Sequence, residues 1–272
     1  MIQQAYDFRD ESEELYRLIE SISDEDFERN SQFKDWTIND VLGHLHMWNW
    51  AADLSLKDND GFMDFIEKLK TDLMSGVSLR KFENNWLDGL KNKELLKEWR
   101  RFFLEMSERF VVAEPKLRVK WMGPDMSVLS SITARLMETW AHGQEVYDLM
   151  GVVRVNKDRI KNISVLGINT FGWTYIVRTM EVPSEKPHVK LIAPSGETWE
   201  WNETNANNSI EGLAEEFCQV VTQVRNITDT KLKVNGEIAN QWMSMAQCFA
   251  GPPETPPAKG TRFTTGTSSP GK

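Results

Sequence analysis

Apolar residues recur at helical spacing over the first 150 residues of the chain. Leu15, Leu18, Ile19 and Ile22 follow the i, i+3, i+4, i+7 pattern of one helix face. Similar stripes predict further helices over residues 37–56, 61–75, 95–110 and 127–150. With the first helix this makes five. Four of the five are long and the one over 61–75 is a shorter insertion, which is typical of an antiparallel four-helix bundle.

The pattern changes after Gly151, a suitable C′ cap for the last long helix. The second half mixes short helices with strands, and β-branched and aromatic residues over 173–179 favour a strand. Pro194-Ser195-Gly196 predicts a turn between two strands, 189–193 and 198–201. Helices are expected near 160–167, from about Ile210, and over 241–249.

We therefore predict an α+β chain with two domains and a tail. The helix bundle occupies residues 1–153 and a smaller α+β domain occupies 154–253. Residues 254–272 consist mostly of Thr, Ser, Pro and Gly, so we expect a disordered tail there.

Composition narrows the range of partners. The net charge of −9 argues against nucleic acid, and no apolar run is long enough to span a membrane. The acidic N-terminus has no signal-peptide pattern, and two cysteines, Cys218 and Cys248, are too few for a disulfide scaffold. We expect a cytoplasmic protein, monomeric or homodimeric, with both cysteines packed in apolar surroundings.

Two helices carry candidate metal ligands. His44 lies on the apolar face of its predicted helix, whereas His46, two residues later, points away from it. Glu138 and His142 are four residues apart and share one face. Separately, His44 could be a buried core histidine, and the Glu138–His142 pair a surface pair. Together they offer two nitrogens and one oxygen, a set that leaves a coordination position open, as in catalytic zinc sites.

The segments around these residues are recognisable. Trp36-Thr-Ile-Asn-Asp-Val-Leu-Gly-His44-Leu and Arg135-Leu-Met-Glu138-Thr-Trp-Ala-His142 resemble signatures of the DinB-like metal-binding bundles. The pair is most similar to the N-terminal domain of mycothiol-dependent maleylpyruvate isomerases. The resemblance implies that His44, Glu138 and His142 bind a divalent metal, usually zinc. It also implies a low-molecular-weight thiol cofactor such as mycothiol.

The second half resembles an actinobacterial-type branch of the same superfamily, with a C-terminal domain similar to the sterol-carrier fold. Matching segments include Ala193-Pro-Ser-Gly-Glu-Thr-Trp-Glu-Trp and Ala246-Gln-Cys-Phe-Ala-Gly-Pro-Pro. The isomerases use a C-terminal arginine against substrate carboxylates, and Arg225 is the nearest candidate. It could equally be a solvated arginine at a helix end.

Three more residues are worth naming. Glu145, one turn after His142, could hydrogen-bond a ligand imidazole or act as a base near the metal, or it could be a solvated carboxylate. Arg135 could pair with Glu138 within the helix. His188 is expected at a hairpin surface.

Two functions remain open. The first is a metal-dependent enzyme, a thiol-dependent isomerase or transferase acting on a small acidic molecule, or a metal-dependent hydrolase. The second is a non-catalytic protein that binds a metal or a small ligand.

Overall fold

The computed structural model describes residues 1–266, which separate into two units, Met1–Val146 and a second that begins at Tyr147. The division falls within the last long helix of the bundle, a few residues before the boundary at 153 that the sequence suggests. Each unit is described below by itself.

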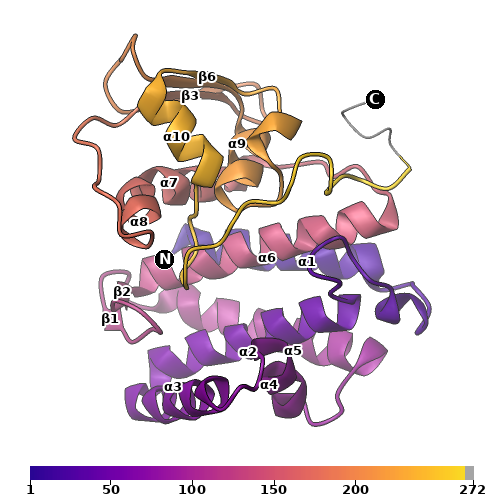
Figure 1. Cartoon of the computed structure of the whole chain (residues 1–272). Coiled ribbons are helices and arrows are strands. Elements are labelled where there is room, and N and C mark those ends of the chain that lie inside the picture. The colour runs from indigo at the N-terminus through magenta and orange to yellow at the C-terminus, as the bar shows by residue number, and fades with distance from the viewer. Residues whose placement is uncertain (267–272) are drawn as a thin grey trace. The chain divides into compact units, whose positions relative to one another are not determined.

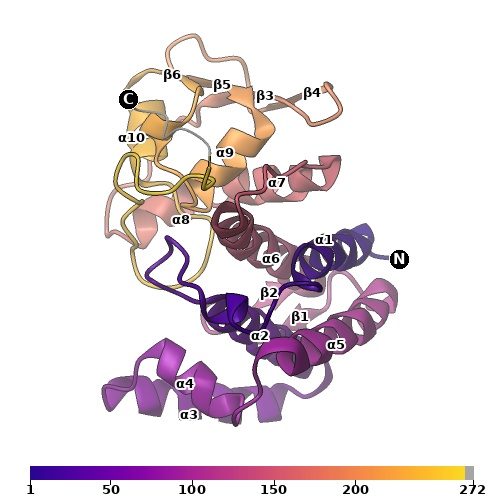
Figure 2. The same cartoon turned by 90° about the vertical axis from the view of Figure 1, so that its right-hand side faces the viewer.

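The first unit is built from the predicted long helices, which lie side by side in Figures 1 and 2. They are α1 (Gln3–Ile19), α2 (Ile38–Lys57), α5 (Asn92–Val112) and α6 (Val128–Met150). Between α2 and α5 lie α3 (Asn59–Met74) and α4 (Leu79–Trp86), and the short strands β1 (Arg118–Val119) and β2 (Met126–Ser127) pair ahead of α6. A short 3-10 turn, η1, spans Asp26–Glu28.

The helical stripes of the sequence form the core of this unit. Trp99, Phe103 and Phe110 of α5 are buried, as are Phe8 of α1 and Trp140 of α6. At the start of α2, the Thr37 side chain accepts from the Asp40 backbone, while the Asp40 carboxylate accepts from the Thr37 backbone. This capping box sets where α2 begins and hence the phase of His44.

The second unit has helices on one face of a four-stranded sheet (Figures 1 and 2). The sheet order is β4-β3-β5-β6, from β3 (His188–Ile192), β4 (Thr198–Trp201), β5 (Ser209–Leu213) and β6 (Lys233–Asn235). The helices are α7 (Lys161–Asn169), α8 (Phe171–Ile176), α9 (Ala214–Val221) and α10 (Glu237–Met245), with 3-10 turns η2 (Asp158–Ile160) and η3 (Ile227–Asp229). The predicted hairpin is confirmed as the antiparallel pair β3–β4, and the α+β class is confirmed as well.

Two local predictions in this unit are wrong. The strand expected over 173–179 is replaced by helix α8, because Phe171 and Tyr175 on one helix face pack with each other and Phe171 packs on Trp242. The helix expected from about Ile210 begins only at Ala214. Ile210 instead lies in β5, where it is buried between Val189 of β3 and Val234 of β6. Both differences come from contacts between segments far apart in the sequence, which override local propensity.

The segment expected to be disordered follows a defined course over residues 254–266. The Glu254 backbone N–H donates to Gln247, and the Glu254 carbonyl accepts from Arg178 and Gln223. Further along, the hydroxyls of Thr264 and Thr265 donate to the side chain and backbone of Asp148. The amino-acid composition did not predict this defined course, because hydrogen bonds rather than buried apolar side chains hold the segment. The rest of the predicted tail, 267–272, lies outside the described residues.

Composition also led to predictions about cysteines and membranes. Cys218 and Cys248 are both buried and are not joined in a disulfide, as predicted. Within residues 1–266, no helix has both the length and the apolar character needed to cross a membrane. A cytoplasmic location and the absence of a nucleic-acid partner stay predictions.

Candidate metal centre

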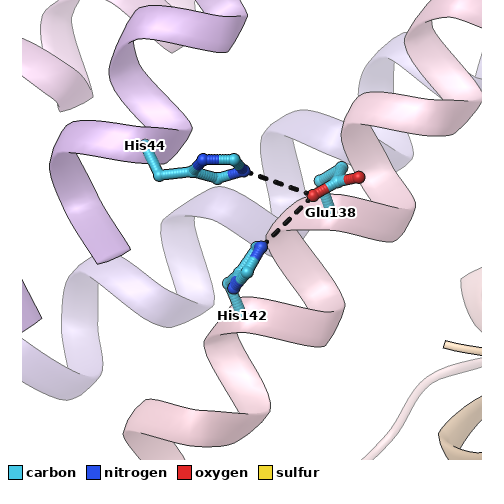
Figure 3. A group of neighbouring side chains, drawn as sticks. All are labelled: His44, Glu138 and His142. Atoms are coloured by element: carbon cyan, nitrogen blue, oxygen red, sulfur yellow. Dashed lines mark hydrogen bonds and ion pairs between the residues drawn. The ribbon is translucent and has the colours of Figure 1, made fainter. Parts of the chain in front are cut away.

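Helices α2 and α6 bring His44, Glu138 and His142 together (Figure 3). Glu138 Oε2 lies 3.4 Å from His44 Nε2 and 3.3 Å from His142 Nε2. One ligand atom from each residue lies within 4.8 Å of the other two. The structure thus brings together the three side chains that the sequence offers as ligands, and their binding of a metal stays a prediction.

These spacings suit a divalent metal. For ligand atoms about 2.1 Å from a tetrahedral ion, neighbouring ligands are about 3.4 Å apart. The distances from Glu138 Oε2 to the two Nε2 atoms match this ligand–ligand spacing. The side chains of His44, Glu138 and His142 are 12, 22 and 13% exposed, so the centre is shielded but reachable. The three residues therefore fit a metal that keeps a position for a further ligand.

Charge favours cation binding at the same place. Burial acts to raise the pKa of Glu138, but hydrogen bonds from His142 and His44 outweigh it and hold that pKa well below its ordinary value. Glu138 is thus a carboxylate at neutral pH. Burial lowers the pKa of His142, so this imidazole is neutral and has a lone pair to offer a metal.

Burial also acts to lower the pKa of His44, but the charges of Glu83 and Glu138 and the hydrogen bonds to both raise it to about 9. The acidic surroundings of His44 therefore attract positive charge. A metal ion at Nε2 would take the place of a proton there.

Aromatic rings enclose the imidazoles. Trp36 stacks on His142 with an interplanar angle of 4° and ring centroids 5.5 Å apart, and Phe33 meets the same ring edge-on at 5.2 Å. Trp36 also packs against His44, with centroids 5.3 Å apart. Such contacts restrict ring rotation, so the ligand atoms are held in place before a metal arrives.

Sequence reasoning missed Glu83, on α4. Its Oε1 lies 2.7 Å from His44 Nδ1 and accepts from Trp48 Nε1 at 3.1 Å. A signal for it does exist, since Leu79, Phe82, Glu83 and Trp86 follow the i, i+3, i+4, i+7 pattern. A glutamate on an apolar stripe is a candidate for a buried functional carboxylate.

Two other predicted residues have different surroundings from those expected. Arg135 is buried and its Nε donates to Asn49 Oδ1 at 2.9 Å; no ion pair joins it to Glu138 at salt-bridge distance. Burial lowers the pKa of Arg135 to about 10, although the charges of Glu138 and Glu83 oppose this. His46, although it points away from the apolar face that carries His44, is buried edge-on to Trp86 and Phe102, and burial lowers its pKa to about 4.

The remaining candidates are also buried. Glu145 is 2% exposed, which excludes the solvated interpretation; its role as a partner of a ligand imidazole or as a base stays a prediction. Arg225 lies in the second unit, where its Nη2 is 2.7 Å from Asp148 Oδ1, so it is not a solvated helix-end arginine. A role in catalysis stays a prediction for Arg225. His188 begins β3 and is buried, with Nε2 3.8 Å from Glu200 Oε2, rather than lying at the surface.

Comparison with known proteins identifies the family. The family described as Mycothiol maleylpyruvate isomerase N-terminal domain matches residues 8–147, about half of the chain, including all three candidate ligands. This chain belongs to that family. Two uncharacterized proteins of Mycobacterium tuberculosis, Rv0036c of strain H37Rv and MT0041 of strain CDC 1551, are each 34% identical over 247 residues, covering 91% of this chain and 95% of the relative. The resemblance to maleylpyruvate isomerases is therefore confirmed at the level of the family.

Solved structures agree with the fold. The crystal structure of the mycothiol-dependent maleylpyruvate isomerase has a TM-score of 0.51 with this chain at 14% identity, and the match covers 80% of this chain and 87% of the other. A histidine-to-alanine mutant of that enzyme gives a TM-score of 0.50 at the same identity and coverage. At this identity the likeness shows a shared fold, a helical domain followed by an α+β domain.

Proposed function

We propose that this member of the maleylpyruvate isomerase family is a divalent-metal-dependent enzyme, with zinc as the metal. The observation that supports the proposal is the donor set of His44, Glu138 and His142, with spacings that suit a tetrahedral ion. Three protein ligands are typical of catalytic zinc, whereas structural zinc takes four.

The chain's own residues define what such a centre can do. His44 and His142 would each offer Nε2, and Glu138 would offer a carboxylate oxygen. When bound, the ion would lower the pKa of a coordinated thiol and so favour the thiolate. Trp36 and Phe33 hold the His142 ring and limit the access of water to it.

The thiol we propose is a low-molecular-weight one such as mycothiol, and the substrate a small acidic molecule. A thiolate can form an S–C bond to an activated double bond, and the same S–C bond breaks after rotation about the former double bond. The thiol is regenerated and the net change is isomerisation. If a leaving group departs instead and the S–C bond remains, the reaction is a transfer. For Arg225 to bind a substrate carboxylate, its guanidinium would have to share or leave Asp148.

Metal content tests the ligand set. The unaltered chain, His44→Ala, Glu138→Ala and His142→Ala should be loaded with zinc, desalted and subjected to elemental analysis. We expect about one ion per unaltered chain and a large loss in each variant. His46→Ala is the matched control, since it removes a buried histidine from the same helix and should retain the metal. Equal metal content in His44→Ala and His46→Ala would refute the assignment.

Ligand binding and turnover test the enzyme. Thermal shift of the zinc-loaded chain with mycothiol should raise the unfolding midpoint, and removal of zinc should abolish the shift. Isomerisation of maleylpyruvate should require both zinc and the thiol. A chain that binds zinc, shows no thiol-dependent shift and turns over no substrate would be the non-catalytic binding protein. Turnover of ester or amide substrates without thiol would indicate a hydrolase.

A further inference from the structure

We infer that Glu83 is a positioning residue of the metal centre, holding His44 as the Nδ1–H tautomer so that Nε2 faces the metal. The inference rests on the proposed function, because it concerns a ligand of the proposed metal. Neither the family match nor the helical pattern around the ligands points to Glu83, which lies 39 residues from His44 along the chain.

The contact geometry fixes the direction of the hydrogen bond. A carboxylate can only accept, so at 2.7 Å the proton between the two residues belongs to His44 Nδ1. Nε2 is on the opposite side of the ring and faces Glu138. A neutral imidazole has two tautomers, and only the one with Nδ1–H leaves a lone pair on Nε2 for a metal. When a metal takes the place of the proton on Nε2, Glu83 keeps the remaining proton on Nδ1 and so selects that tautomer.

The carboxylate is itself held in position. The indole of Trp48 donates to Oε1, the same oxygen that accepts from His44. Trp48 lies one turn after His44 on α2, and its ring packs against Phe65 and Trp121. Two donors from one helix therefore converge on Oε1, and the Glu83 side chain is only 3% exposed.

Three contacts of helix α4 position Glu83 next to His44. The Ser78 side chain caps the helix by accepting from the Lys81 backbone N–H at 3.2 Å. Phe82, next to Glu83, is buried in the apolar cluster that α2, α3 and α4 form together. At the end of α4, Leu87 packs so closely on Gly43 that a Cβ there would lie 2.6 Å from Leu87 Cδ1. The glycine directly before His44 thus admits the close approach of α4.

A purely structural role explains Glu83 poorly. Its position on the stripe of α4 would suit a leucine, and burying a charge without compensation destabilises a protein. Asp53, further along α2, shows the ordinary structural solution: its buried carboxylate pairs with the cationic side chains of Arg109 and Lys57. Glu83 Oε1 is bonded instead to an indole and to an imidazole, and that imidazole is no longer a cation once a metal replaces the proton on its Nε2. A carboxylate behind a histidine is the usual companion of a metal ligand, where it orients the ring and makes the ligand nitrogen more basic.

The test compares Glu83→Gln with a matched control. Glutamine keeps the size and one acceptor but removes the charge, whereas Glu83→Asp keeps the charge and shortens the reach to Nδ1. The control, Asp53→Asn, neutralises another buried carboxylate whose partners are Arg109 and Lys57. Zinc affinity of the full chain is measured by competition with a chromogenic chelator. We expect both Glu83 variants to bind zinc about 10–100-fold more weakly, and Asp53→Asn to bind as the unaltered chain does.

Nuclear magnetic resonance supplies a second readout. Long-range proton–nitrogen spectra of the zinc-loaded unaltered chain should show the His44 Nδ1 proton, shifted downfield by its carboxylate partner. In Glu83→Gln that proton should move upfield or be lost to exchange. If Glu83 were merely structural, replacing it would change stability and leave the zinc affinity unaltered.

The outcomes separate this inference from the proposed function. If the unaltered chain binds no zinc, the proposed function fails and the inference fails with it. If the unaltered chain binds zinc and both Glu83 variants bind it equally well, the metal centre stands and only the role of Glu83 is overturned.

Discussion

Replacing Gly167 by alanine should destabilise the second unit, although alanine is the better helix former. Gly167 lies in α7, where α9 packs against it. A Cβ at this position would lie 2.9 and 3.0 Å from the two methyl carbons of Val221 and 3.1 Å from the Phe217 ring. Both neighbours are buried, and the β-branched valine has little freedom to rotate away. The added methyl group therefore has nowhere to go without a shift of one helix.

Two opposing terms set the size of the effect. Exchanging glycine for alanine in a helix interior stabilises it by about 1 kcal/mol. Inserting a methyl group into a packed core costs about 1–3 kcal/mol. Contacts of 2.9 to 3.1 Å to three atoms place this site in the middle of that range, so the net loss should be about 1 kcal/mol.

Gly172→Ala is the matched control. Gly172 is in α8 of the same unit, and a Cβ there would make one ordinary contact, 3.7 Å from Val182. This variant should be stabilised by about 0.5–1 kcal/mol. Urea unfolding followed by circular dichroism gives both free energies, and amide exchange over residues 161–169 and 214–221 locates the change. If Gly167→Ala proved as stable as Gly172→Ala, the packing argument at the α7–α9 contact would be refuted.

Three further predictions concern the second unit. Burial raises the pKa of Cys218 to about 12 from 9.0, so at pH 8 its thiolate is about a thousandfold scarcer and iodoacetamide should modify it only after unfolding. Because the folded chain holds that proton more tightly, the stabilisation from Cys218 is present below pH 9 and is lost as pH rises towards 12, which unfolding curves over that range would reveal. A chain ending at Pro253 loses the hydrogen bonds to Asp148 and should melt at a lower temperature, whereas an unchanged midpoint would mean that the segment contributes nothing. Gly236→Ala should unfold at lower urea concentration, since its φ is 91° and a Cβ would lie within 1.8 Å of the Asn207 carbonyl oxygen; a midpoint equal to that of the unaltered chain would contradict this.

The candidate metal centre could be predicted largely because its information is local. Glu138 and His142 share a face by spacing alone, and the capping box at Thr37 fixes the phase that turns His44 toward them. Glu83 could not be placed in this way. Its helix is short, and its partner lies on another helix 39 residues away, so only tertiary packing shows what its carboxylate contacts.

The difference between local and long-range information also explains which elements of the second unit could be predicted. The β3–β4 hairpin was predictable from a turn and two adjacent strands. Strand β5 was not, because it pairs in parallel with β3, from which β4 separates it along the sequence, and local propensity carries no information on such pairing. Helix α8 was missed for a similar reason, since Phe171 packs on Trp242, which is far along the chain.

The ordered course of residues 254–266 has a consequence for biosynthesis. Domains generally fold as units while the chain is being made, N-terminal first, at about 5–20 residues per second. The metal ligands all lie before residue 147, so their helices can assemble while translation continues. The second unit has to wait longer, because groups on Arg178, Gln223 and Asp148 find their partners only in residues 254–266, which are synthesised after the rest of that unit. Its native hydrogen bonding is therefore completed only once residues 254–266 have left the ribosome.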